Sequence, residues 1–140
     1  MTLYKGRCHC GAITVEFETN TDPATIDVRE CQCAFCRAHG AESASDPNGR
    51  IRYIERETGD IVRYRFGTKS CDFIICRHCG VYLGAVMEDD ETPGFSTTQI
   101  KHFEDRALFT KTARHPDYDD EPLTNRLTRR RRNWTPMATS

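Results

Sequence analysis

The sequence predicts an all-β domain that ends in a short helical tail. Three observations support this prediction: short segments of alternating polarity, turn residues between them, and cysteines gathered in tight clusters. The alternation is clearest in residues 12–18, where Ile13, Val15 and Phe17 would share the buried face of a strand. Comparable segments follow at residues 26–28, 51–54, 61–66, 73–75 and 82–87. Short strands separated by turns are typical of an all-β fold.

Turn and loop residues separate these segments. Asp-Pro-Asn-Gly at residues 46–49 and Thr-Gly-Asp at residues 58–60 favour tight turns. Residues 88–94 contain four consecutive acidic side chains followed by Thr-Pro-Gly. Because like charges repel and resist packing, this segment predicts a loop.

A different pattern marks the C-terminal part of the chain. Residues 123–132 predict a helix, because acidic residues and Pro122 precede it and arginines end it, which complements the helix dipole. Trp134 is the only tryptophan, and we expect it to be buried. We therefore predict a zinc-binding β domain over residues 1–112 and a tail over residues 113–140 that packs on it.

Seven of the eight cysteines fall into three clusters. The first cluster is Cys8 and Cys10, the second is Cys31, Cys33 and Cys36, and the third is Cys76 and Cys79. Closely spaced thiols converge on one point, as a metal requires, whereas disulfides usually join cysteines spread along the chain. Zinc in a structural site takes four protein ligands, and catalytic zinc typically takes three. The clusters therefore predict two zinc ions per chain, one structural and one catalytic.

The first and third clusters are expected to share the structural zinc. Each pair is followed by a glycine, Gly11 or Gly80, which can adopt the positive φ that a chain turning around a metal often needs. His9 and His78 lie between the paired cysteines, and we expect their side chains to point away from the metal.

The middle cluster, C-x-C-x-x-C, supplies three thiolates and has no fourth cysteine nearby in sequence. A substrate thiol could take the fourth position, where coordination would lower its pKa and make it a nucleophile. Alternatively, Cys71 or His39 closes this site, which would then be a second structural zinc. Cys71 has a further interpretation as a small buried apolar residue.

Composition is consistent with a single metal-stabilised domain of 140 residues, because only 37% of them are hydrophobic. The net charge of -1 gives no overall bias toward nucleic acid or anionic membranes. No stretch is long and apolar enough to cross a membrane, and none after Met1 is typical of a signal peptide. Free thiols in these numbers predict a reducing, cytoplasmic location.

The motifs G-R-C-H-C-G, C-x-C-x-x-C-R and C-x-x-C-G occur here in the order found in one family, and residues 3–110 closely resemble it. This is the glutathione-dependent formaldehyde-activating enzyme family, which also includes centromere protein V. The resemblance implies a zinc-stapled β-tent fold. It also implies a structural zinc on the first and third motifs, a catalytic zinc on the middle motif, and glutathione as a co-substrate.

Two functions follow as hypotheses. The first is a carbon–sulfur lyase, similar to S-(hydroxymethyl)glutathione synthase and used in aldehyde detoxification, that joins glutathione or another small thiol to an aldehyde. His39 is then a candidate general acid, and Arg37 a candidate ligand for a substrate carboxylate. The second is an adaptor that binds nucleic acid or protein through Arg126 and residues 129–132. We favour the lyase, with small thiol and aldehyde partners and no nucleic acid, and leave the oligomeric state open, a homodimer included.

Overall fold

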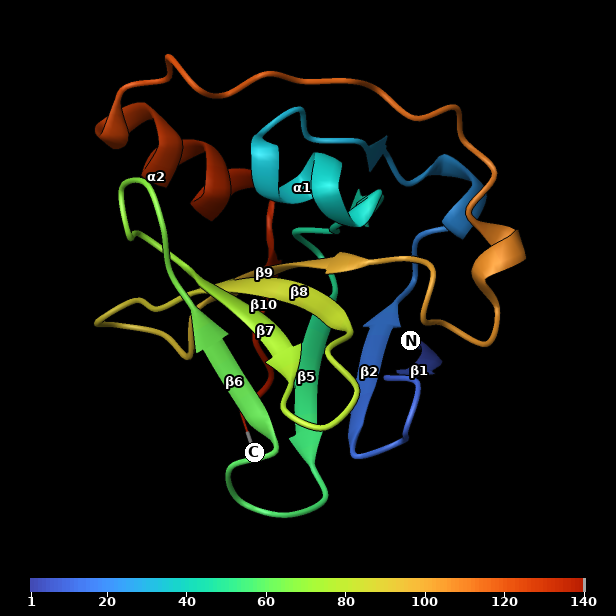
Figure 1. Ribbon diagram of the computed structural model, residues 1–140. Coiled ribbons are helices and arrows are strands. Elements are labelled where there is room, and N and C mark those ends of the chain that lie inside the picture. The colour runs from blue at the N-terminus through green and yellow to red at the C-terminus, as the bar shows by residue number, and fades with distance from the viewer. Residues whose placement is uncertain (140) are drawn as a thin grey trace.

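The computed structural model describes residues 1–139, which form two antiparallel β-sheets and two short α-helices (Figure 1). The smaller sheet has the strand order β1-β2-β5, with β1 at Thr2–Arg7, β2 at Ile13–Thr19 and β5 at Arg50–Glu55. The larger sheet has the order β3-β4-β9-β8-β7-β6, and β10 pairs with β9. Its strands are β3 (Val28–Arg29), β4 (Ser43–Ala44), β6 (Ile61–Tyr64), β7 (Asp72–Cys76), β8 (Tyr82–Met87), β9 (Phe95–Gln99) and β10 (Thr135–Pro136). The predicted all-β class is confirmed.

One apolar core joins the two sheets. Alternate side chains of β2, Ile13, Val15 and Phe17, are fully buried, as the alternation in the sequence predicts. They belong to the same buried cluster as Leu83 and Val86 of β8 in the larger sheet. Burial of these side chains is the main apolar contribution to stability.

Strand β8 is buried along its whole length, because both of its faces are covered. Leu83 faces the core between the sheets, whereas Tyr82 belongs to a cluster with Cys36 of the first helix, α1 (Ala34–His39). Ala85 belongs to another cluster, with Trp134 of the tail. Figure 1 shows α1 and the second helix, α2 (Leu123–Asn133), above the larger sheet, the side on which these clusters form.

The tail packs on the larger sheet. Helix α2 is Leu123–Asn133, one residue longer than predicted, and Trp134 directly after it is only 6% exposed, so its predicted burial is confirmed. In β10, Thr135 pairs with Ser96 of β9. The tail therefore adds both a helix and a strand to the β structure.

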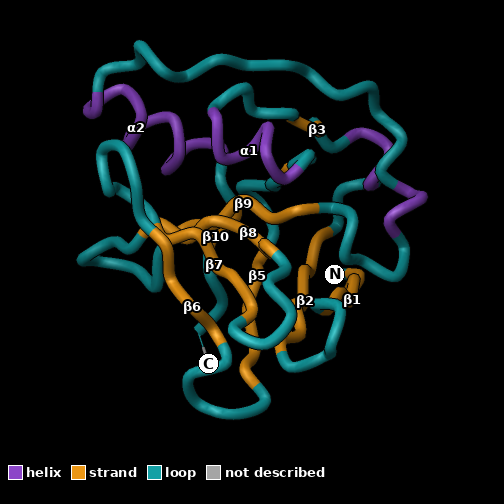
Figure 2. The backbone as a smooth tube through the Cα atoms, viewed as in Figure 1, coloured by secondary structure: helices purple, strands orange, loops and turns teal. Residues whose placement is uncertain are grey.

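A long loop connects the 3-10 helix η2 (Arg106–Leu108) to α2 and runs over the top of the molecule (Figure 2). It is tied down where it passes the chain before α1. The amide of Arg114 donates to the carbonyl of Val28, and the amides of Glu30 and Gln32 donate to the carbonyls of Arg114 and Pro116. These bonds hold the segment that carries Cys31 and Cys33.

Several predicted elements differ from the structure. Residues 26–28 were expected to be a strand, but the chain first forms a 3-10 turn, η1 (Pro23–Thr25), because Pro23 opens the turn and the Asp22 side chain accepts from the Ala24 amide. Strand β6 ends at Tyr64, before the predicted residue 66. No helix within residues 1–139 combines the length and apolar character needed to span a membrane.

Candidate metal centres and the adjoining cavity

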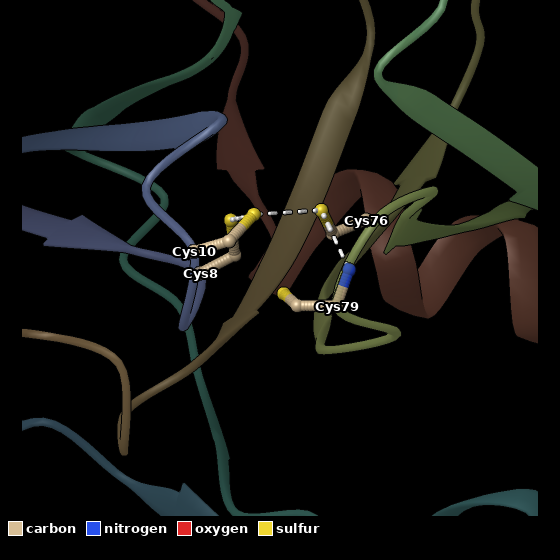
Figure 3. Close-up of side chains that lie close together, drawn as sticks. All are labelled: Cys8, Cys10, Cys76 and Cys79. Carbon is tan, nitrogen blue, oxygen red and sulfur yellow. Dashed lines mark hydrogen bonds between the residues drawn. The ribbon is translucent and has the colours of Figure 1, made fainter.

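The first and third cysteine clusters meet in space, and the four sulfurs of Cys8, Cys10, Cys76 and Cys79 lie within 4.8 Å of one another (Figure 3). The Sγ atoms of Cys8 and Cys10 are 3.7 Å apart, and those of Cys10 and Cys76 are 3.6 Å apart. Tetrahedral zinc, with zinc–sulfur bonds of about 2.3 Å, requires sulfurs about 3.8 Å apart. All eight cysteines are free of disulfides. The donor set and its spacing therefore fit a closed zinc site.

Matching backbone turns build the two halves of this four-cysteine site. Cys8 and Cys10 lie in the β1–β2 turn, Cys76 is the last residue of β7, and Cys79 lies in the turn between β7 and β8. The amide of Ile13 donates to Cys8 Sγ at 3.3 Å, and the amide of Cys79 donates to Cys76 Sγ at 3.5 Å. Such bonds favour the thiolate that zinc binds.

Positive φ angles end both turns, 80° at Gly11 and 76° at Gly80. Side-chain-bearing residues rarely adopt this region, so the glycines allow the chain to reverse around the sulfurs. Burial raises the pKa of the Cys79 thiol, but backbone amides, including that of Cys10, outweigh it and bring the pKa to about 6. His9 and His78 are exposed and lie outside the sulfur group, as expected.

The middle cluster forms a second group, in which the sulfurs of Cys31, Cys33 and Cys36 lie within 4.8 Å of one another. Cys33 caps α1, its Sγ accepting from the Cys36 amide at 3.4 Å. Hydrogen bonds from the thiols of Cys31 and Cys36 lower the pKa of Cys33 to about 2. The neighbouring thiols raise the pKa of Cys31 and of Cys36. Three sulfurs this close together are nevertheless a donor set that zinc accepts.

No other histidine, cysteine, aspartate or glutamate within residues 1–139 joins this three-cysteine site. Cys71 packs instead with Ala85, Met87 and Trp134. His39 is exposed on α1, where its Nδ1 lies 3.0 Å from the carbonyl of Phe35. Neither candidate for a fourth ligand is therefore in place.

The three-cysteine site opens into a cavity of about 480 Å³. Phe66, Phe73 and Tyr82 form an aromatic wall, and Trp134 lies on the tail side. Arg37, predicted to hold a substrate carboxylate, lines the cavity, whereas His39, the predicted general acid, does not. A role for either side chain in the chemistry stays a prediction.

Arginines form the remaining wall. The sequence analysis named those of the tail only as the binding surface of an adaptor, and it did not name Arg29. Arg29 of β3 and Arg126, Arg129 and Arg130 of α2 all line the cavity. Burial lowers the pKa of Arg29 and of Arg130. A signal for the helix residues was available, since positions 126, 129 and 130 have the i, i+3, i+4 spacing of one helix face.

Glu121 neutralises part of this charge. Its carboxylate accepts two hydrogen bonds from Arg129, both of 3.0 Å, and the Arg129 guanidinium also lies 3.6 Å from the ring centre of Tyr118. Hydrogen bonding to Arg129 holds the pKa of Glu121 below its usual value. Within residues 1–139, neither Arg29 nor Arg130 has a carboxylate partner of this kind.

Comparison with known proteins agrees with the family resemblance of the sequence. The family model for the glutathione-dependent formaldehyde-activating enzyme matches residues 3–117. A crystal structure of a Rhodobacter sphaeroides protein, from a structural genomics programme, is 31% identical and superposes with a TM-score of 0.54. That match covers 71% of this chain and 87% of the other.

Proposed function

This chain belongs to the glutathione-dependent formaldehyde-activating enzyme family, and we propose that it is a carbon–sulfur lyase that joins a small thiol to an aldehyde. The observation that carries the proposal is the three-cysteine site, which lacks a fourth side-chain ligand within residues 1–139 and opens into a cavity. The two cysteine groups, one closed and one open, favour zinc at both. Zinc at the open site would bind the substrate thiol and lower its pKa, so that the thiolate is available near neutral pH.

The chain's own residues hold and enclose the reactants. Cys31, Cys33 and Cys36 fix the position of the metal, and the aromatic wall formed by Phe66, Phe73 and Tyr82 lets the substrate exclude water from the site. The thiolate sulfur then bonds to the aldehyde carbon, and the carbonyl π electrons move to the oxygen, which takes a proton. The product is an S-hydroxyalkyl thiol adduct, and no oxidant or reductant is needed.

His39 is the candidate proton donor, and Arg37 is the candidate ligand for a substrate carboxylate. Arg37 lines the cavity, where its guanidinium can hold an anionic oxygen in place. His39 lies two residues further along α1, is exposed and is not part of the cavity lining, so a bridging water is the proposed route for its proton. Both roles are proposals that follow from the sequence.

The test is the rate of S-hydroxymethylglutathione formation from formaldehyde and glutathione, followed by NMR exchange spectroscopy because the spontaneous reaction is fast. We expect wild type to exceed the protein-free rate and Cys33→Ser to match it. Cys71→Ser is the matched control for metal content, since it removes the remaining thiol of the cavity wall but no member of the sulfur group. Equal rates for wild type, Cys33→Ser and buffer would refute the assignment for this aldehyde.

The arrangement of the C-terminal arginines argues against the alternative of an adaptor that binds nucleic acid through them. Arg130 is buried and Arg129 is paired with Glu121. Arg131 is exposed but lies 3.5 Å from Asp89. Of the four arginines at residues 129–132, this leaves Arg132 as the one that is exposed and has no ion pair within residues 1–139. Salt-dependent DNA binding needs several accessible cations on one face.

A further inference from the structure

Arg29 and Arg130 line the cavity and donate hydrogen bonds to neutral side chains. Arg29 Nη2 donates to Ser45 Oγ and to Thr97 Oγ1, both at 2.9 Å, and Arg130 Nη1 donates to Ser70 Oγ at 2.7 Å. All three acceptors are neutral hydroxyls. Within residues 1–139, no carboxylate oxygen lies within 4.0 Å of either guanidinium.

The carboxylates nearest to these arginines already have other partners. Asp27 lies 2.7 Å from Lys111 and 3.6 Å from Arg114. Glu121 accepts from Arg129, as described above. Asp119 is the acidic side chain of the cavity lining, and it is exposed. The cavity therefore has a surplus of positive charge on its tail side.

Unused hydrogen-bond donors also lie on the tail side of the cavity. The Nε atoms of Arg126 and Arg130 are buried and have no acceptor within residues 1–139. The Arg126 Nε atom lies 3.6 Å from Glu121 Oε1, which is too long for a hydrogen bond. Buried donors without acceptors and buried cations without anions are both unfavourable, and one bound oxyanion would satisfy both.

The arginines are also shaped for such a ligand. A guanidinium offers planar, paired N–H groups that match the oxygens of a carboxylate or phosphate. Arg130 is held by Ser70 and by Trp134, whose ring centre lies 5.0 Å from the guanidinium carbon. A side chain fixed in this way loses little freedom when it binds.

We propose that Arg29 and Arg130 form an oxyanion subsite that binds an acid group of the substrate, while the substrate sulfur lies at the three-cysteine site. This inference rests on the proposed function and specifies its substrate class: a small thiol that carries a carboxylate or phosphate remote from its sulfur. The aromatic wall accommodates the apolar part of the molecule between them. Arg130 lies outside residues 3–117, the part matched by the family model, so the tail of this chain sets the preference.

The test separates acid recognition from metal binding by using a ligand without a free thiol. S-Methylglutathione keeps both carboxylates, and its dimethyl ester lacks them. By isothermal titration calorimetry on the zinc-loaded protein, we expect the acid to bind at least about tenfold more tightly than the ester, the effect of one charge-assisted hydrogen bond. This comparison needs no mutation, so it holds even where a variant fails to fold.

Variants then locate the subsite. Arg130→Met and Arg29→Met should each remove most of the preference for the acid, and Arg130→Lys should restore part of it. Arg132→Met is the matched control, because Arg132 is on the same helix but exposed and outside the cavity lining. The proposal would be overturned if Arg132→Met lost the preference for the acid to the same extent, or if Arg130→Met and Arg29→Met kept that preference unchanged.

Competition identifies the kind of acid. Displacement of S-methylglutathione by succinate assigns the subsite to carboxylates, and displacement by inorganic phosphate assigns it to phosphate esters. Displacement by neither contradicts an oxyanion subsite. The result is independent of the lyase assay. Acid binding that depends on Arg130 in a protein without lyase activity would refute the proposed function but not the subsite. Lyase activity that is equal for acid thiols and ester thiols would refute the subsite but not the proposed function.

Discussion

Cys10 Sγ and Cys76 Sγ lie 3.6 Å apart although 66 positions separate the two residues in sequence. Cys10 lies beside the smaller sheet and Cys76 ends a strand of the larger one, so the four-cysteine site joins the two sheets. The three-cysteine site lies within one short segment and joins only the chain around α1. The two sites should therefore respond differently to the loss of a ligand.

We predict that Cys79→Ser unfolds or aggregates, whereas Cys33→Ser stays folded with about one zinc per chain. Structural zinc contributes on the order of 10 kcal/mol to folding, which is comparable with the whole stability of a domain. Near-UV circular dichroism and metal analysis measure the two effects. Equal loss of the fold in both variants would show that the three-cysteine site is also structural.

Trp134 anchors the tail, since it is buried against Cys71, Ala85 and Met87. Truncation after Thr112 should lower the melting temperature by several degrees, because the indole stabilises the fold by roughly 2 kcal/mol. Trp134→Ala tests the same contact without removing β10. A melting temperature unchanged in both proteins, measured by differential scanning calorimetry, would contradict the role of the anchor.

His102 should make stability depend on pH. Burial lowers the pKa of His102 from its usual 6.5 to about 4, and its Nε2 lies 3.2 Å from the carbonyl of Leu83. Between these pH values the unfolded chain binds a proton that the folded chain does not, so the free energy of unfolding falls as pH falls, by about 3 kcal/mol in total.

His102→Gln removes this titration and should flatten the decrease between pH 6.5 and pH 4. Urea unfolding at several pH values measures the free energy of unfolding of wild type and of His102→Gln. Because acid releases metal from both proteins, the difference between them isolates the effect of the histidine. The same slope in wild type and in His102→Gln would rule out the histidine as its source.

Access of a thiol to the three-cysteine site can be seen with cobalt in place of zinc. Glutathione should change the visible spectrum, whereas S-methylglutathione should change it much less even while it occupies the cavity. A metal that already carries three thiolates is a poor activator of water, so we also expect no general esterase activity. Identical spectral changes with both ligands would argue against coordination by the thiol.

The sequence by itself determined the features that depend on neighbouring residues. The alternation in residues 12–18 predicted β2, because side chains of a strand point alternately to its two faces. The charge order around residues 123–132 predicted α2 to within one residue. The cysteine spacing predicted both sulfur groups, since a metal needs its ligands within a few ångströms.

Elements whose stability comes from partners distant in sequence were missed. Strand β9 has the sequence Phe-Ser-Thr-Thr-Gln, which shows no apolar alternation, yet Ser96 to Gln99 are buried because β8 lies on one side and β4 and β10 lie on the other. Helix α1 has six residues, too few to show a helical period, and it starts where the Cys33 sulfur caps it.

Only the tertiary structure decided which arginines matter. The run at residues 129–132 is uniform in sequence, but the position of α2 on the sheet buries Arg130 and leaves Arg131 and Arg132 exposed. The cavity draws its walls from segments far apart in sequence, among them the chain around α1, the β6–β8 region, strand β9 and the tail. Charge and burial at such a site depend on how distant segments pack, which a local pattern of residues does not encode.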